Sequence, residues 1–243
     1  MDPEPGPEPR TAKTGRLLPR LALALAALCA LGAAVFWATL PDVRPLKTQW
    51  PKTTAFMERR KADLRKAGQS DRLEWTPVPL SAIAPELARL TVLAEDSRFR
   101  QHGGVDWDAV REAAKKNYEK GKLKVGGSTI TQQLAKNLYL SPARNPWRKL
   151  RELAIAWRLE RVLGKQRILE LYLNVIEFGR RTYGAEAAAR RYFQKAARDL
   201  DRDEAALLAA VIPSPRIYDL ERHRDRAERR ARRILDRDRA GPD

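Results

Sequence analysis

Cysteine and histidine are scarce in this chain of 243 residues, which contains one cysteine and two histidines. The single cysteine, Cys29, cannot form an intrachain disulfide, and it gives no support to a thiol mechanism. No Cys/His cluster offers the ligands of a zinc site. No internal repeat is present, and low-complexity sequence is confined to the acidic, proline-bearing start at residues 2–9, which we expect to be disordered. These absences exclude a disulfide scaffold and a structural zinc domain.

Acidic residues are outnumbered by basic ones, 31 against 48, which gives a formal net charge of +17 and a pI of about 10.4. Such a surplus favours an anionic partner: nucleic acid, anionic lipid or a phosphate-bearing substrate. The arginine-rich end, residues 216–243, has apolar residues at helical spacing, and we interpret it as a solvated amphipathic helix or tail that can touch anionic lipid. Nucleic acid is disfavoured because no aromatic platform or reader motif accompanies the arginines.

Charged residues are also missing between Leu21 and Leu40. At ~1.5 Å per residue this run spans roughly 30 Å, the thickness of a bilayer core, and it predicts a transmembrane anchor. The alternative is a cleaved signal peptide, because the run is rich in alanine and follows two arginines. A signal peptide has a shorter apolar core, about 7–15 residues, and a small-x-small cleavage site, which is not evident here. Basic residues flank both ends of the run, so flanking charge does not fix the topology.

The length leaves room for one domain with a sizeable core beside this anchor. Helical periodicity and caps recur through this domain, and no convincing pair of strands is present, which predicts a mostly α fold. We expect the chain to be divided into an N-terminal disordered segment at 1–20, the anchor at 21–40, a linker at 41–52, the main domain at 53–215 and the arginine-rich tail at 216–243.

Two adjacent acids, Glu95 and Asp96, stand at the end of an apolar helix that Ser81 can cap. Desolvation and the negative helix terminus both raise the pKa of a carboxyl group in this position, as a general base or acid near neutral pH requires. The alternative is a solvated acidic pair. Phe99 and His102 at matched spacing, followed by two glycines, favour a functional site.

A glycine turn at residues 126–127 leads from a cationic loop into a second helix. Ser128 or Thr129 can cap this helix, and Thr129-x-x-Gln132 fits a capping box. Free N–H groups at a helix N-terminus are a natural site for an oxyanion or a phosphate, although a purely structural cap is the commoner meaning of such a turn. The polar face further along this helix carries Gln133, Lys136 and Asn137.

A third helix is punctuated by an Asn-Pro start at residues 145–146 and by Gly164 at its end. On it Arg148, Lys149 and Glu152 stand three and four residues apart, so the three side chains can converge. A surface salt-bridge cluster, which contributes little to stability, is an equal alternative.

Five motifs occur in order along the domain. They are Glu95-Asp-x-x-Phe99-x-x-His102-x-Gly, Gly126-Gly-Ser-Thr-Ile-Thr-Gln-Gln133-Leu-Ala-Lys136-Asn137, Arg148-Lys149-x-x-Glu152, Lys165-x-x-Ile-Leu-Glu170-x-Tyr-Leu-Asn174 and Ala205-Ala-Leu-Leu-Ala-Ala210. Together they resemble the motifs of glycosyltransferase family 51, the peptidoglycan glycosyltransferases, over roughly residues 53–215. With an N-terminal anchor and no Ser-x-x-Lys motif of a transpeptidase, the chain resembles the monofunctional biosynthetic type of Gram-negative bacteria.

The resemblance implies a lysozyme-like, two-lobed, mostly α domain that polymerises lipid II into β-1,4 glycan strands, without transpeptidase activity. The 4-hydroxyl of an incoming GlcNAc attacks C1 of the lipid-linked MurNAc, undecaprenyl diphosphate leaves, and the anomeric configuration inverts. Glu95 matches the general base, and Glu152 matches a second essential acid that organises cations or a metal. The other matched positions, which hold the diphosphate or line the cleft, are Asp96, Phe99, His102, Thr129, Gln133, Lys136, Asn137, Arg148 and Lys149.

The same resemblance implies the partners and the location. The partners are lipid II and the growing chain on undecaprenyl diphosphate, the membrane, and proteins of cell-wall synthesis or division, but no nucleic acid. The protein would cross the inner membrane once, with its N-terminus in the cytoplasm and its catalytic domain in the periplasm. No tightly bound cofactor is expected; a divalent metal, Mg or Mn, is implied for several relatives, and the sequence shows no independent ligand set for it.

Two alternatives of other classes stay open. A lysozyme-like hydrolase would share the fold and a key glutamate, and it would cut finished glycan without requiring a lipid diphosphate. A catalytically inactive membrane scaffold of the cell-wall machinery would keep the helices and tolerate the loss of Glu95. The intact acids and cations argue against the scaffold.

Overall fold

The computed structural model describes residues 17–120, 127–143 and 145–241. The chain divides into two units, residues 1–40 and residues 41–243. The start expected to be disordered and the expected cationic loop fall mainly at residues 1–16 and 121–126, which lie outside the described residues.

The first unit contains helix α1, Leu17–Ala38. Its stretch Pro19–Ala38 is the one helix among the described residues with the length and apolar composition to cross a membrane. The apolar side chains of this stretch are exposed, with Leu23 at 73%, which is the arrangement that lipid contact requires. The helix fits a protein that crosses the inner membrane once.

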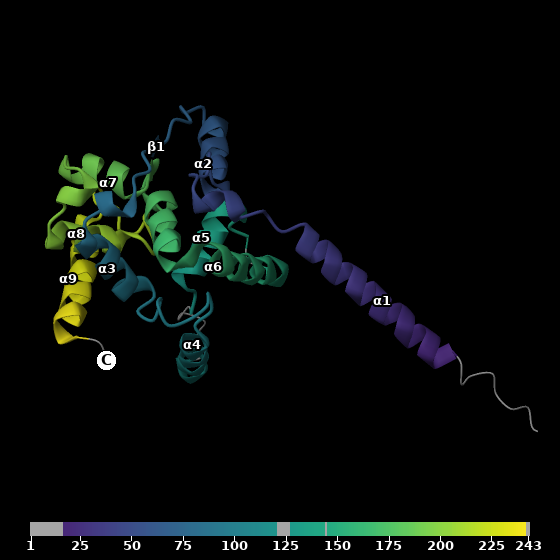
Figure 1. The fold of residues 1–243 in the computed structure, drawn as a ribbon. Coiled ribbons are helices and arrows are strands. Elements are labelled where there is room, and N and C mark those ends of the chain that lie inside the picture. The colour runs from purple at the N-terminus through teal and green to yellow at the C-terminus, as the bar shows by residue number, and fades with distance from the viewer. Residues whose placement is uncertain (1–16, 121–126, 144, 242–243) are drawn as a thin grey trace, which may run out of the picture. The chain divides into compact units, whose positions relative to one another are not determined.

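The second unit is mostly helical, as the sequence predicts (Figure 1). Its helices are α2 (Ala55–Lys66), α3 (Pro85–Glu95), α4 (Trp107–Lys120), α5 (Ile130–Tyr139), α6 (Pro146–Val175), α7 (Ala185–Phe193), α8 (Arg202–Val211) and α9 (Arg224–Ala240). Short 3-10 helices are η2 (Arg44–Lys47), η3 (Leu80–Ala82) and η4 (Ala197–Asp199). In Figure 1, α5 and α6 lie at the centre of this unit and α3, α8 and α9 lie together at its side, in agreement with their contacts.

The pair of α5 and α6 forms the centre of the core. An apolar stripe on α5, with Ile130, Leu134 and Leu138 at spacings of four, is buried where α5 packs against α6. The Asn145 side chain accepts a hydrogen bond from the Arg148 N–H at 2.7 Å and caps α6, with proline at the first helical position, as predicted. Gly164 has φ +74 and divides α6 into two helical segments. Glycine adopts this left-handed conformation without the strain that a Cβ causes, so the kink follows from the sequence.

A small sheet, which the sequence did not reveal, joins two segments that lie far apart in the chain. Strand β3 (Thr182–Tyr183) lies between β1 (Glu74–Trp75), which runs parallel to it, and β2 (Glu177–Gly179), which runs antiparallel. The expectation of no strand pair was wrong because strands of two or three residues are too short to show an alternating pattern.

Helix α3 begins later than expected. Ser81 lies in η3, and the position before α3 is Ala84, whose side chain makes no cap. Pro85 starts the helix instead, since its fixed φ suits the first helical turn and its missing N–H is not needed there. Helix α4 leaves apolar side chains exposed, with Trp107 at 68% and Val110 at 38%.

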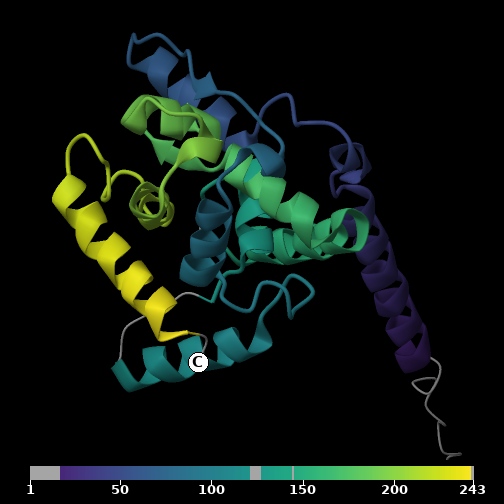
Figure 2. The ribbon, with the colours of Figure 1, turned by 60° about the vertical axis from the view of Figure 1, so that its left-hand side comes forward.

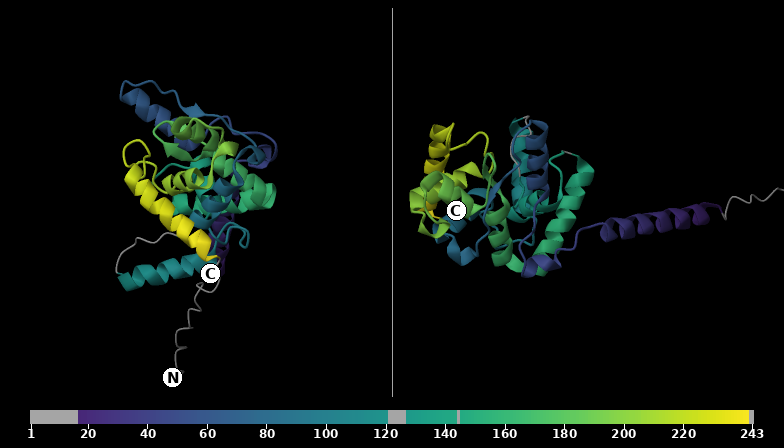
Figure 3. Two further views of the ribbon diagram at one scale, coloured as in Figure 1. Left: turned by 90° about the vertical axis from the view of Figure 1, so that its left-hand side faces the viewer. Right: turned by 90° about the horizontal axis from the view of Figure 1, so that it is seen from above.

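The arginine-rich end is part of the compact unit. Helix α9, the yellow helix in Figures 2 and 3, packs against α3 and α8. Its buried residues are Ala227, Ala231, Ile234 and Leu235, which are those at the predicted helical spacing. The amphipathic pattern was therefore interpreted correctly, and its apolar face packs against the domain, so α9 belongs to the same compact unit, residues 41–243.

The expected linker at 41–52 is likewise folded onto the domain. Val43 and Leu46 are buried, and η2 contacts α6. Arg167 of α6 donates hydrogen bonds to the carbonyl oxygens of Leu46 at 2.8 Å and Gln49 at 2.9 Å. These hydrogen bonds hold residues 41–52 against α6, although the composition of the segment is that of a linker.

Candidate active site

Glu95 is the last residue of α3, and its side chain is only 8% exposed. Its Oε2 accepts a hydrogen bond from Gln133 Nε2 at 3.0 Å, and its Oε1 lies 3.1 Å from Arg230 Nη2. Burial raises the pKa of the Glu95 carboxyl group, while Gln133 and Arg230 act in the opposite direction. A buried carboxylate with this balance is suited to take a proton near neutral pH.

The amide of Gln133 is oriented by a buried tyrosine. Tyr172 Oη donates to Gln133 Oε1 at 2.9 Å, so the amide NH2 group is turned toward Glu95. Burial raises the pKa of Tyr172 well above its usual value, which keeps the phenol a neutral donor. Three residues from α3, α5 and α6 thus form one hydrogen-bonded chain that ends on the Glu95 carboxylate.

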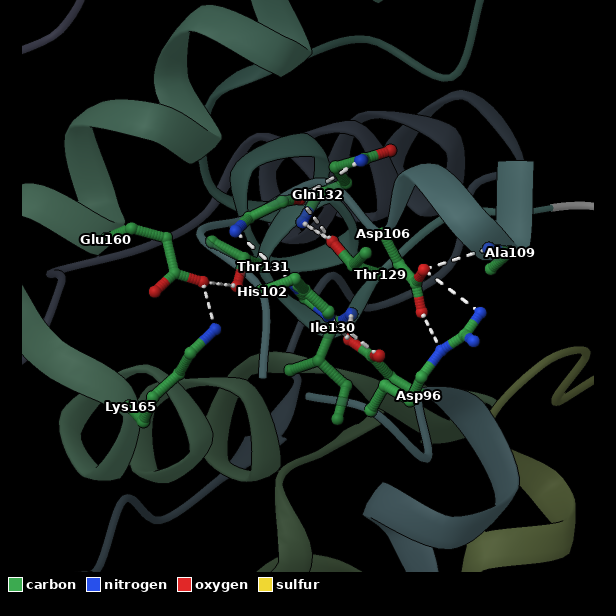
Figure 4. Close-up of polar contacts among 12 residues, drawn as sticks. Asp96, His102, Asp106, Ala109, Thr129, Ile130, Thr131, Gln132, Glu160 and Lys165 are labelled. Carbon is green, nitrogen blue, oxygen red and sulfur yellow. Dashed lines mark hydrogen bonds and ion pairs between the residues drawn. The ribbon is translucent and has the colours of Figure 1, made fainter. Parts of the chain in front are cut away.

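Asp96 is buried and holds the start of α5 (Figure 4). Its Oδ2 accepts the Ile130 N–H at 3.0 Å, and its Oδ1 lies 2.9 Å from His102 Nε2. His102 Nδ1 accepts the Gly104 N–H at 3.2 Å, which assigns the ring proton to Nε2 and makes it the donor to Asp96. The first N–H of α5, one of the groups considered for an oxyanion or phosphate, is therefore already bound by Asp96.

Phe99 and Thr129 support the same turn. Phe99 is 1% exposed, with the His102 ring at its edge and Lys165 Nζ 4.4 Å from its ring centroid. Thr129 Oγ1 accepts the Gln132 N–H at 3.2 Å, as predicted for a cap, and donates to the Gly104 carbonyl at 2.7 Å. The second half of the expected capping box is replaced by another contact, because the Gln132 amide donates to the same Gly104 carbonyl at 3.1 Å.

The three predicted residues on α6 do converge. Glu152 is buried, with a side chain 4% exposed, and forms ion pairs with Arg148 Nη1 and Lys149 Nζ. Lys149 Nζ also donates to Gln132 Oε1 at 2.7 Å and lies 3.4 Å from Ser128 Oγ. The second and third motifs are therefore joined through Lys149, in an arrangement that a solvated surface cluster would not have.

Lys136 and Asn137 lie further along α5. Lys136 Nζ is 5.9 Å from the centroid of the Phe56 ring of α2. Asn137 Nδ2 donates to the Gln133 carbonyl at 2.8 Å, one turn earlier in α5. Asn137 thus stays beside Gln133 on α5, while Lys136 lies near Phe56 of α2.

Two adjoining pockets connect the groups just described. Glu95 and Asp96 line a pocket of about 430 Å³ that also borders Ser128, Thr129 and Arg237. Lys149 lines a second, more apolar pocket of about 650 Å³ that also borders Ser128. A substrate bound across Ser128 would meet the buried carboxylate on one side and the cation cluster on the other.

The side chains closest to a metal ligand set within the described parts of the chain are Asp96, His102 and Asp106, whose ligand atoms lie within 4.8 Å of one another. Both Asp106 oxygens bind Arg98, at 2.8 and 3.1 Å, and the Ala109 N–H reaches Oδ1 at 2.8 Å. Asp96 and His102 are satisfied by Ile130, Gly104 and each other (Figure 4). Because protein donors already occupy these atoms, the set does not fit a resident divalent ion.

Sequence reasoning missed two residues of this site. Tyr172 belongs to the fourth quoted motif but was given no role in the site. Arg230 belongs to the segment interpreted as a tail. A signal for Arg230 was present, because it lies three residues after Ala227 and four before Ile234 and so shares a side of the helix with that buried stripe.

Comparisons with known proteins agree with the fold. The family model described as Transglycosylase matches residues 61–239, which includes α9. A protein of Nitrosospira multiformis named biosynthetic peptidoglycan transglycosylase is 48% identical to this chain, over 77% of this chain and 81% of the relative. A protein of Chromobacterium violaceum with the same name is 44% identical, over 85% of this chain and 87% of the relative. The relative from Thiobacillus denitrificans is 50% identical over 72% of this chain and 74% of its own length. With its motifs in order around a buried glutamate and a family match over most of its length, this chain belongs to the transglycosylase family.

Proposed function

We propose that this chain is a peptidoglycan glycosyltransferase that polymerises lipid II, with Glu95 as the general base. The observation that carries the proposal is the buried Glu95 carboxylate, whose pKa burial raises, in a pocket that adjoins the pocket lined by Lys149 of the Arg148–Lys149–Glu152 cluster. The names of the relatives support the same substrate class.

In the proposed reaction, the Glu95 carboxylate accepts the proton of the GlcNAc 4-hydroxyl as the hydroxyl oxygen bonds to C1 of MurNAc. The bond from C1 to the diphosphate oxygen breaks, and its electron pair leaves with undecaprenyl diphosphate. Attack opposite the leaving group inverts the anomeric centre and gives the β-1,4 linkage. A diphosphate is already a good leaving group, so it needs positive charge more than a proton, and we assign this role to Arg148 and Lys149.

The state of Glu152 favours transfer over hydrolysis. A glycosidase needs a second carboxyl group free to act as acid, base or nucleophile. Glu152 is buried and paired with two cations, so it is suited to arranging them and not to proton transfer. This supports the polymerase over the lysozyme-like alternative.

The location follows from the substrate. Helix α1 would anchor the chain in the inner membrane, and the catalytic domain would act at the periplasmic face, where lipid II is polymerised. Protease treatment of intact spheroplasts tests this topology, because it degrades the domain only if the domain is periplasmic. Dependence on Mg or Mn and partners in cell-wall synthesis or division stay predictions.

The test is polymerisation of labelled lipid II by purified full-length protein in detergent, beside Glu95→Gln and the control Glu86→Gln in the first turn of the same helix. We expect long, lysozyme-sensitive glycan from the wild type and from the control, and none from Glu95→Gln. Equal polymerisation by Glu95→Gln would refute the base assignment. Release of soluble muropeptides from preformed glycan, without polymerisation, would establish the hydrolase instead.

A further inference from the structure

Arg230 of α9 reaches the Glu95 carboxylate from a position 135 residues later in the sequence. The two oxygens of Glu95 have separate partners, Gln133 on Oε2 and Arg230 on Oε1. The Arg230 side chain is 24% exposed, and its guanidinium carbon lies 5.7 Å from the centroid of the Tyr218 ring. Within the described residues, Glu95 is its hydrogen-bond partner, and the buried Arg230 Nε has none.

The position of Arg230 is set by the packing of α9. Arg230 shares a side of α9 with the buried stripe that rests against α3 and α8. Asp238 near the end of α9 binds Arg89 of α3 and Arg202 of α8, the latter at 2.7 Å. Arg237 donates to the Leu93 carbonyl at 3.1 Å. These contacts tie the C-terminal part of α9 to α3, the helix that carries Glu95, so the guanidinium is held in place before substrate binds.

We propose that Arg230 is a positioning residue of the transferase site, which holds Glu95 as an oriented carboxylate, and that α9 is therefore part of the active site. The inference rests on the proposed function, in which Glu95 is the general base. A base works only while it is ionised, and burial alone favours the neutral acid. A guanidinium on one oxygen and an amide on the other stabilise the ionised form and fix the plane of the carboxylate.

The charged and titratable groups around Glu95 determine the direction in which loss of Arg230 shifts the pKa of Glu95. Asp96 is the adjacent acid and raises the pKa of Glu95, and Tyr172 from α6 is neutral. Arg230 lowers the pKa of Glu95, and Arg237 of the same helix lines the pocket. Removal of Arg230 therefore raises the pKa of Glu95, and the acidic limb of the kcat/KM profile moves to higher pH.

The experiment is the pH profile of kcat/KM for lipid II polymerisation by full-length wild type, Arg230→Met, Arg230→Lys and Arg232→Met. Arg232 is exposed on the same helix, so Arg232→Met makes the same change of charge away from Glu95. We expect Arg230→Met to move the acidic limb up by about one pH unit, as for loss of a close opposite charge. Below the limb its kcat/KM then falls about tenfold, because each pH unit changes the ionised fraction tenfold. For Arg230→Lys and Arg232→Met, we expect the acidic limb of the kcat/KM profile to stay at the wild-type pH.

Three outcomes separate this role from a structural one and from failure of the proposed function. A fall in activity by the same factor at every pH, without a shift of the limb, would overturn the inference and leave Arg230 a packing residue. A wild-type profile for Arg230→Met together with an inactive Glu95→Gln would overturn the inference alone. Wild-type activity of Glu95→Gln would remove the base on which the inference rests. If Arg230→Met does not fold, Arg230→Gln carries the same test.

Discussion

Replacement of Glu152 by alanine would leave Arg148 and Lys149 without their shared carboxylate. The Arg148 and Glu152 side chains are 16% and 4% exposed, so removal of Glu152 leaves a largely buried cation unpaired, which costs about 3 kcal/mol. Lys149 is 40% exposed and contributes about 0.5 kcal/mol after solvent screening. The free energy of unfolding therefore falls by about 3.5 kcal/mol, which for a chain of this size lowers Tm by roughly 7–14 °C.

The assay is thermal unfolding of the full-length protein in detergent, followed by circular dichroism, with polymerisation measured in parallel. The control is Glu228→Ala, which removes a pair with Arg224 at the same i, i+4 spacing on an exposed face and should change stability by less than about 0.5 kcal/mol. A Tm for Glu152→Ala within 2 °C of wild type would refute the conclusion that Glu152 holds the two cations. Glu152→Gln should bind lipid II more weakly because its cations are no longer held in place.

Three further predictions follow from the backbone, from the pKa of Glu95 and from α9. Gly184 has φ +83, and a Cβ there would lie 2.7 Å from the Asn174 carbonyl oxygen. Gly184→Ala should therefore lower the free energy of unfolding, measured by denaturant titration, by at least about 2 kcal/mol. The control Gly68→Ala, whose Cβ would meet open space, should lower it by about 1 kcal/mol. Burial raises the pKa of Glu95 in the folded state, so ionisation of Glu95 destabilises the folded protein once the pH exceeds the pKa that Glu95 has in the unfolded chain. The Tm of Glu95→Gln should therefore match that of the wild type near pH 4 and equal or exceed it at pH 7. Deletion of 216–243 should abolish polymerisation and lower solubility, because it exposes the faces of α3 and α8 that α9 covers; a soluble, active deletion variant would contradict the packing.

The local part of the site was accessible from the sequence. Arg148, Lys149 and Glu152 converge because residues three and four apart on a helix are neighbours whatever the rest of the fold does. The same holds for the Asn145 cap and the Gly164 kink, which depend on single residue types. Helix periodicity also selected the apolar face of α9, although it could not say what that face binds.

The sequence by itself determined the apolar anchor candidate, the helices with their caps, and the cation cluster on α6, because each depends on residues close together in the chain. Only the tertiary structure decided which partners Glu95 has, since Gln133 and Arg230 are 38 and 135 residues away from it. It also decided that Asp96 binds the start of α5 and that the arginine-rich end folds onto α3 and α8. Contacts of this kind arise from the packing of whole helices, and no local periodicity encodes which buried faces meet.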